Sequence, residues 1–248
     1  MAERGKLVIS GDQVDDALWR KLESRRDLEE LVIWGGAITN DRLEPVSRMT
    51  WLTGVGLGEV PVDDGVLVHL QPLRELECLN LAYTGVTGDF TRLLGTPLRD
   101  VRLEGCRRTG DACARSLARF PTLRQVEMHM TGLTDDGLAA MAALPLEVLW
   151  LGPRITDRGM ETIGGFANLR HLDICTHLIT DEGVRALAGL QQLQVLWLTR
   201  SRVSDASIEV LSQFTGLREL NVNYTEITAQ GLARLKLALP ECRLVEPD

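Results

Sequence analysis

Apolar residues recur along the chain in one short pattern, L-x-x-L-x-L, in which other aliphatic residues replace some of the leucines. Copies start at residues 28, 52, 76, 98, 123, 146, 169, 193 and 217, so successive copies lie 22 to 25 residues apart. The alternation in the second half of the pattern is that of a strand with one buried face. Nine copies with so narrow a period predict a chain built from one repeated unit that begins with a short strand.

The second half of each unit also repeats, as a polar turn followed by apolar residues at helical spacing. Ile-Thr-Asp-x-Gly stands at residues 155–159 and 179–183, with a close copy at 133–137 and a looser one at 203–207. The Thr or Ser is suited to cap a helix, and the helix dipole favours the Asp in the first turn. Each unit therefore predicts a strand, a tight loop, a capped helix and a return. The second to fourth units depart from this motif, and we expect irregular loops there.

These two motifs together resemble the leucine-rich-repeat family, in its ribonuclease-inhibitor-like form with cysteine-poor bacterial repeats. The resemblance implies an α/β fold, a right-handed solenoid bent into an arc, with a parallel β-sheet on the concave face and short α-helices on the convex face. It covers roughly residues 28–240. Residues 1–27 are expected to form an N-terminal capping repeat and residues 241–248 a C-terminal capping strand. We therefore expect a single domain over residues 1–248.

The expected arc favours a particular class of ligand. Parallel strands stack about 4.8 Å apart, whereas packed helices need about 8–10 Å. The stack must therefore bend with its strands on the inside. A long concave wall suits a protein partner better than a small molecule, which prefers a closed pocket.

Strand alternation predicts which side chains line this wall. The leucines point into the core, so the residues that flank and separate the last two face outward. Three of the five tryptophans (Trp34, Trp150 and Trp197) fall there, and Trp is enriched at interface hot spots. The alternative is that each Trp covers the backbone of a neighbouring strand. The predicted protein-binding residues are Trp34, Arg102, Glu104, Glu127, His129, Trp150, His171, Asp173, Trp197 and Asn221.

Charge narrows the choice of partner. The outward rows of the nine repeats carry six acidic residues and one base, Arg102, a net −5 with histidine neutral. This predicts a partner with a basic face, unless the charges only keep the strands solvated. The chain as a whole carries −8, which argues against nucleic acid or an anionic membrane. Five arginines in the loops after the strands could form a basic rim or be ordinary exposed residues: Arg107, Arg108, Arg154, Arg200 and Arg202.

The five cysteines are spread along the chain without a CxxC pair, which is neither a disulfide framework nor a zinc pattern. Free thiols suggest a reducing compartment. No signal peptide or long apolar segment is visible, so we expect a cytoplasmic protein that is monomeric by itself and needs no cofactor.

One group of residues is a candidate for chemistry. His171, Asp173 and Cys175 share a strand face and could bind zinc or form a thiol–imidazole pair. However, alternate residues on a strand lie about 6.5–7 Å apart at Cα, and the wall is open to solvent. No phosphate-binding loop, HExxH pair or GxSxG elbow occurs. The glycine run at residues 54–58 spans a strand, where a partner's backbone could approach closely.

The sequence thus favours a non-enzymatic protein-binding scaffold with an inhibitor, immunity or adaptor role. Two alternatives stay open. The first is a secreted or injected effector, or a recognition subunit, that acts on host proteins. The second is a metal-dependent or thiol enzyme built around His171, Asp173 and Cys175.

Overall fold

The computed structural model describes residues 5–245 of the chain. The chain divides into two compact units, Met1–Thr131 and Gly132–Asp248. The parts of the expected caps at residues 1–4 and 246–248 lie outside the described residues. A single domain over the whole chain stays a prediction, and the two units are described separately below.

Among its described residues, the first unit contains six parallel strands, each paired with the next one along the chain. They are β1 (Lys6–Ser10), β2 (Glu30–Trp34), β3 (Gly54–Gly58), β4 (Cys78–Asn80), β5 (Asp100–Arg102) and β6 (Gln125–Met128). The helical segments between them are η1 (Gly11–Gln13), α1 (Asp16–Leu22), η2 (Asn40–Arg48), η3 (Asp64–Val66), α2 (Leu67–Leu70), η4 (Phe90–Leu93) and α3 (Asp111–Leu117), where η marks a 3₁₀ helix.

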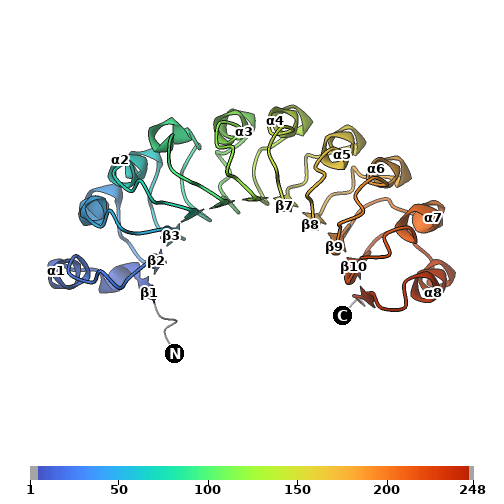
Figure 1. Cartoon of the computed structure of the whole chain (residues 1–248), viewed down its shortest axis with the longest axis horizontal. Coiled ribbons are helices and arrows are strands. Elements are labelled where there is room, and N and C mark those ends of the chain that lie inside the picture. Colours follow the sequence, from blue (N-terminus) through green and yellow to red (C-terminus); the bar gives the residue numbers. More distant parts are fainter. Residues whose placement is uncertain (1–4, 246–248) are drawn as a thin grey trace. The chain divides into compact units, whose positions relative to one another are not determined.

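The second unit repeats this plan with five parallel strands among its described residues. They are β7 (Val148–Leu151), β8 (His171–Ile174), β9 (Val195–Trp197), β10 (Glu219–Asn221) and β11 (Arg243–Leu244). The helical segments are α4 (Asp135–Ala140), α5 (Asp157–Gly164), α6 (Asp181–Ala186), η5 (Asp205–Ser207), α7 (Ile208–Leu211) and α8 (Ala229–Ala238). Within each unit the strands form one layer and the helical segments the other (Figure 1).

The repeated aliphatic residues form the core between these two layers. Leu31 pairs in register with Val55, and Leu172 with Leu196, and all four are at most 2% exposed. Burying them removes apolar surface from water, which is the main force that holds such a stack together. Within the two segments expected to be caps, β1 pairs in register with β2 and β11 with β10.

The helical segments are α-helices where the Ile-Thr-Asp-x-Gly motif is intact and include 3₁₀ turns in several units without it. 3₁₀ turns replace or precede the α-helix in units one to three, as η2, η3 and η4, whereas unit four carries the α-helix α3. Pro45 lies inside η2, where it has no backbone N–H to donate. Irregular structure is therefore present in the second and third units as expected, but also in the first unit, where it was not expected, whereas the helix of the fourth unit is regular.

The Asp of the motif has a role that the sequence did not reveal. Asp157 accepts hydrogen bonds from the backbone N–H of Thr180, at 2.8 Å, and from its hydroxyl, at 2.6 Å. It therefore joins its own repeat to the next one. Its carboxylate also occupies the space that a Cβ on Gly183 would need, which explains the Gly of the motif. The same pair of bonds forms at Asp64–Thr87, Asp135–Thr156, Asp181–Ser204 and Asp205–Thr228.

Candidate functional site

The ten predicted wall residues divide evenly between the two units. The first unit holds Trp34, Arg102, Glu104, Glu127 and His129, and the second holds Trp150, His171, Asp173, Trp197 and Asn221. Seven of them are at least partly exposed, as expected. Glu127, Asp173 and Asn221 are not, with exposures of only 8%, 9% and 8%. These three side chains belong to the outward rows, but neighbouring side chains cover them, so the expectation that they are open to solvent is wrong.

In the second unit, three aromatic side chains pack side by side on the outward face of the sheet. The ring centroids of Trp150 and His171 lie 5.5 Å apart in an edge-on arrangement, and those of His171 and Trp197 lie 6.2 Å apart. All three are partly exposed. We call Trp150, His171 and Trp197 the aromatic row. Asp173 stands in register between the two tryptophans, on the strand that also carries His171.

Polar contacts hold one end of the aromatic row in place. Trp197 Nε1 donates a hydrogen bond of 2.8 Å to Glu219 Oε1, and Arg243 Nη1 lies 3.2 Å from Glu219 Oε2. His171 Nε2 has no hydrogen-bond partner among the described residues. Burial lowers the pKa of His171, although the charge of Glu219 opposes this. His171 therefore contributes a neutral ring at pH 7.

The first unit carries a cluster of carboxylates at β5 and β6. Burial raises the pKa of Glu127 to about 7, and the negative charge of Glu104 adds to this effect. The Tyr83 hydroxyl donates a hydrogen bond to Glu104, which raises the pKa of Tyr83 to about 12. Arg102 binds Asp100 through two nitrogens, at 2.8 and 3.2 Å. The predicted basic residue of the wall is therefore already paired with an acid.

Tyr83 lies shortly after β4, and sequence reasoning did not single it out. Tyr83 directly follows the last outward-facing position of its repeat, Ala82, and has a φ of 58°, in the left-handed region. The equivalent positions in two other repeats hold Gly35 and Gly105, also with positive φ. Glu59, Met130, Arg200 and Tyr224 hold the same position in four further repeats, also with positive φ, so a left-handed residue here is a feature of the repeat. The ring of Tyr83 lies over Gly105, in the space that a Cβ there would occupy.

The wall is less acidic than the nine repeats alone predict. The two terminal strands, β1 and β11, lie outside the nine repeats. They place Lys6 beside Glu30 and Arg243 beside Glu219. The Lys6 Nζ–Glu30 Oε1 distance is 2.9 Å. These two bases lower the excess of acidic charges in the outward rows from five to three. The outward rows keep a net negative charge.

Comparison with known proteins agrees with this geometry. A family model described as "Leucine Rich repeat" matches residues 167–188, which contain β8 and α6. Two internalin structures from Listeria monocytogenes are similar over most of both chains. Internalin inlF is 18% identical, covers 99% of this chain and 87% of its own, and has a TM-score of 0.50. Internalin C2 is 21% identical, covers 90% and 84%, and has a TM-score of 0.51.

This chain has the leucine-rich-repeat fold. A third similar structure is the plant peptide hormone receptor RGFR1 in complex with RGF2, at 13% identity and a TM-score of 0.51. It is matched over all of this chain but only 46% of its own length. At these identities the similarities show the fold alone. No curated protein is significantly similar to this leucine-rich-repeat protein in sequence.

The candidate residues for chemistry are not arranged as a metal site. His171 is packed in the aromatic row, Asp173 is buried, and Cys175 is partly exposed. Within residues 5–245, no group of three or more His, Cys, Asp or Glu side chains could hold a metal ion. None of the described helices is both long and apolar enough to pass through a membrane.

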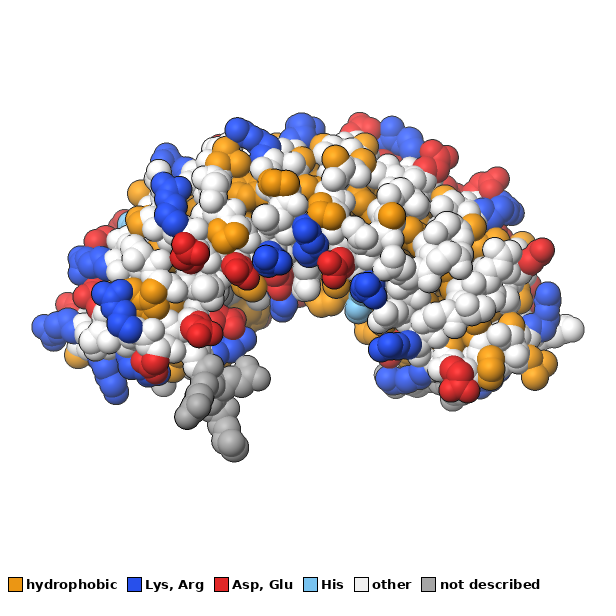
Figure 2. All heavy atoms as spheres, viewed as in Figure 1, with side chains coloured by type: hydrophobic (Ala, Val, Ile, Leu, Met, Phe, Trp, Pro, Cys, Tyr) orange, Lys and Arg blue, Asp and Glu red, His pale blue; other side chains and the backbone are white. Residues whose placement is uncertain are grey.

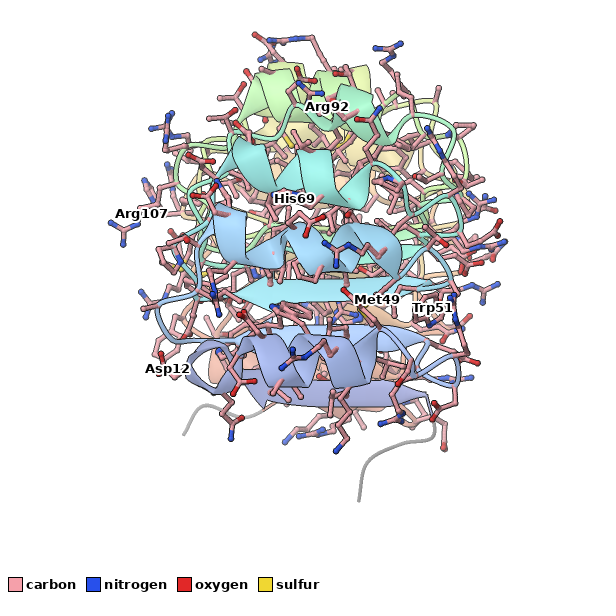
Figure 3. All side chains as sticks on the ribbon, turned by 90° about the vertical axis from the view of Figure 1, so that its left-hand side faces the viewer. Asp12, Met49, Trp51, His69, Arg92 and Arg107 are labelled. Carbon is pink, nitrogen blue, oxygen red and sulfur yellow. The ribbon has the colours of Figure 1, made fainter. Side chains whose placement is uncertain are left out.

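The five loop arginines of this leucine-rich-repeat protein are all exposed. In the first unit, Arg107 projects from one edge, while Trp51 lies at the opposite edge (Figure 3). In the second unit, the Arg200 guanidinium lies 5.8 Å from the centre of the Tyr224 ring. Basic and acidic side chains are intermixed over the face drawn in Figure 2. No rim of a single charge is visible on that face.

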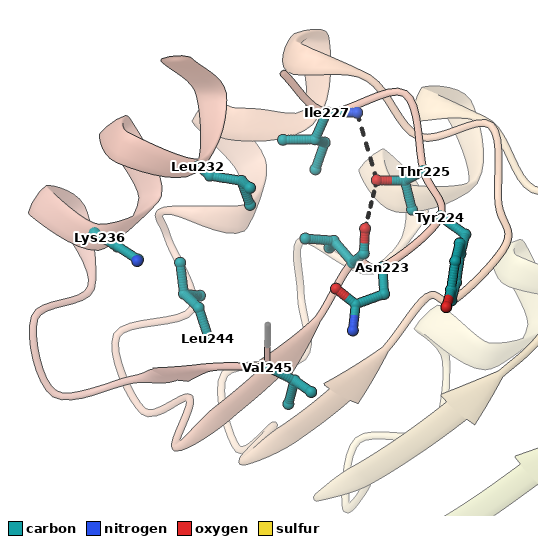
Figure 4. A pocket seen from close by; sticks show the side chains of 9 residues that line it. Asn223, Tyr224, Thr225, Ile227, Leu232, Lys236, Leu244 and Val245 are labelled. Atoms are coloured by element: carbon teal, nitrogen blue, oxygen red, sulfur yellow. Dashed lines mark hydrogen bonds between the residues drawn. The ribbon is translucent and has the colours of Figure 1, made fainter. Parts of the chain in front are cut away.

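A hollow of about 380 Å³ lies at the last repeat of the second unit (Figure 4). Ile227, Leu232 and Leu244 supply its apolar lining, with Lys236 and Tyr224 at its margin. It lies where the final repeat leaves part of the apolar interior uncovered. Its floor is held by Thr225, whose hydroxyl donates to the Val222 carbonyl and accepts from the Ile227 N–H.

Proposed function

We propose that this leucine-rich-repeat protein is a non-catalytic scaffold that binds a protein partner on the outward face of its second unit. The aromatic row is the centre of the proposed interface, and this grouping of Trp150, His171 and Trp197 is the observation that carries the proposal. The fold supports it, since solenoids use their extended sheet faces for binding. The similar plant receptor was solved in complex with RGF2, which also fits a binding role.

Pre-organisation strengthens the aromatic row as an anchor. Binding requires that surface side chains lose rotational freedom, which costs free energy. The Trp197 ring is already restrained by its hydrogen bond to Glu219, and Glu219 is held in turn by Arg243. A partner that covers the row therefore gains contact area at a reduced entropic cost.

The charges around the aromatic row favour a cationic partner. Asp173 lies in register between Trp150 and Trp197, and Glu219 contacts Trp197 directly. An Arg or Lys side chain over an indole ring is attracted by the ring face and by nearby carboxylates. His171 is neutral at pH 7 and does not repel such a cation. The proposal therefore includes a basic face on the partner.

The proposed biological role is that of an inhibitor, an immunity protein or an adaptor in the bacterial cytoplasm. The five cysteines are free thiols, which is compatible with a reducing compartment. A secreted or injected effector that acts on host proteins is the second candidate. Capture experiments with extracts of the native cell and of a host cell separate the two, because each predicts binding in only one extract.

The test compares wild-type protein with a Trp150→Ala/Trp197→Ala double variant. Partners are captured from the extract, identified and purified, and their affinities measured by calorimetry. We expect the double variant to bind at least about 30-fold more weakly, because truncation of a central hot-spot residue costs about 2 kcal/mol or more. Trp51→Ala is the matched control, since Trp51 lies off the wall and donates to the Leu28 carbonyl.

A basic partner adds a second expected result. The affinity of the wild type should fall as the salt concentration rises, because salt screens the attraction between the carboxylates and the partner. Unchanged affinity in the double variant, with native circular dichroism, would show that the partner binds elsewhere. Any catalytic activity that disappears with Cys175→Ala would instead favour the thiol-enzyme alternative.

A further inference from the structure

Strand β3 of the first unit lacks side chains at its outward positions, which are Gly54, Gly56 and Gly58. Side chains of β2 lie over them instead. A Cβ on Gly54 would lie 2.7 Å from Glu30 Cγ, and the Trp34 ring fills the space beside Gly58. All three glycines are buried. The expectation that a partner's backbone approaches them is therefore wrong, because the neighbouring strand already covers this backbone.

This arrangement leaves a hollow of about 290 Å³ on the sheet face of the first unit. Val8 and Val32 line one side, and Cys78 and Asn80 line the other. Since a water molecule in the liquid occupies about 30 Å³, the hollow has room for roughly ten water-sized groups. One aromatic side chain fits this space, whereas a folded element does not.

The charges in the hollow argue against an ionic ligand. Lys6 is paired with Glu30 at 2.9 Å, and Arg102 is paired with Asp100 at 2.8 Å. A charged ligand would have to disrupt one of these pairs before it gained a partner of its own. The four charges also sum to zero. A neutral ligand with an apolar body is therefore favoured.

Asn80 supplies one directed polar contact in the hollow. Its Oδ1 accepts a hydrogen bond of 2.9 Å from the Ala82 N–H, which holds the amide in place. Its Nδ2 donates no hydrogen bond within residues 5–245. A ligand with an acceptor oxygen next to its apolar body would satisfy this donor.

We propose that the hollow is a second binding site, which takes a neutral aromatic side chain of the tyrosine type from a protein partner. Val8 and Val32 contact the ring, and the Asn80 amide donates to its oxygen. The site lies in the first unit and shares no residue with the aromatic row. It therefore extends the proposed function, and it can be tested independently.

Cys78 provides the test, because its exposed thiol lines the hollow. Cys106 and Cys113 are buried, and the two partly exposed cysteines are replaced in a Cys175→Ser/Cys242→Ser background. The protein is equilibrated with disulfides that carry hydroxyphenyl, phenyl, cyclohexyl, carboxylate or ammonium groups on the same linker. Mass spectrometry of the intact chain measures how much thiol reductant each adduct withstands.

The hydroxyphenyl adduct should withstand at least about tenfold more reductant than the carboxylate or ammonium adducts, and more than the phenyl adduct. Val8→Trp fills the hollow from its rim and should remove this preference. Val68→Trp is its control, since Val68 is 47% exposed on α2, outside the hollow. Asn80→Asp keeps the acceptor for the Ala82 N–H but removes the donor, and should abolish the advantage of the hydroxyl.

Three results would overturn the proposal: equal retention of all groups, preference for a charged group, or an unchanged preference in Val8→Trp. Failure of Cys78 to react, while the denatured chain reacts fully, would overturn it too, since the hollow would then be closed. The Trp150→Ala/Trp197→Ala variant should show the same preference among the disulfide reagents at Cys78 as the wild type does. A failure of the proposal on the aromatic row can therefore be distinguished from a failure of the proposal on the hollow.

Discussion

Replacing Glu127 by Gln should stabilise the protein at alkaline pH and have little effect at acidic pH. Glu127 is 8% exposed, and burial together with the nearby Glu104 carboxylate raises its pKa from 4.5 to about 7. Gln has the same shape as the protonated side chain and can donate to Glu104 as the protonated acid does. The variant therefore represents the state in which Glu127 carries no charge at any pH.

The magnitude follows from proton linkage. The folded state holds the Glu127 proton more tightly than the unfolded chain does. The wild type therefore loses stability as the pH rises from 4.5 to 7, and the loss is complete above that window. Each pH unit between the two pKa values is worth about 1.4 kcal/mol, so ionisation of Glu127 destabilises the fold by about 3 kcal/mol. The variant avoids this cost, whereas below pH 4.5 both proteins are neutral at this position.

The assay is urea-induced unfolding of both proteins between pH 4 and pH 8, followed by circular dichroism. The difference in free energy of unfolding should grow with pH and level off above pH 7. Glu75→Gln, at an exposed position of the same unit, is the control and should give a nearly constant difference. Parallel stability profiles for the wild type and Glu127→Gln would refute the reasoning, since they would mean that Glu127 ionises in the folded state as it does in water.

Two other predictions concern contacts between neighbouring repeats. Asp157→Ala should destabilise the second unit by about 1–3 kcal/mol in chemical denaturation, because it leaves the Thr180 donors without their acceptor. Asp136→Ala, at an exposed ion pair, should cost less than about 1 kcal/mol, and equal effects would contradict the proposed inter-repeat role. With Tyr224→Phe, Tyr83 is the remaining tyrosine, and its ultraviolet titration should have a midpoint at about 12. Adding Glu104→Gln should move that midpoint toward 10, and no movement would show that the hydrogen bond does not hold the phenol.

Much of the fold could be predicted because its determinants are local and repeated. A buried strand needs aliphatic residues at alternate positions, and each repeat supplies them at the same place, such as Leu31 and Leu172. The helix starts could also be predicted from the sequence, because a capping Thr and an acidic neighbour act within one turn. Irregular structure was also predicted around η3 and η4, since the motif is incomplete there, whereas η2 around Pro45 was not predicted.

The candidate site was less predictable, because its properties depend on residues about 20 to 25 positions apart. Strand alternation places Glu127 and Asp173 on the outward face, but their burial depends on the size of side chains on adjacent strands. The packing of the Trp150, His171 and Trp197 rings against one another depends on the rotamer of each side chain. Alternation alone contains no information on that choice.

The sequence by itself determined the repeated strand-and-helix plan and the set of side chains that turn away from the core. Only the tertiary structure decided which of them are covered, paired or ionised. Asp157 accepts hydrogen bonds from the next repeat, and the Trp34 ring covers the backbone of β3 at Gly58. Lys6 on β1 forms an ion pair with Glu30 on the adjacent strand β2. The physical reason is that periodicity specifies the direction of a side chain, whereas its solvation and charge depend on neighbours that only the stacking of repeats brings into contact.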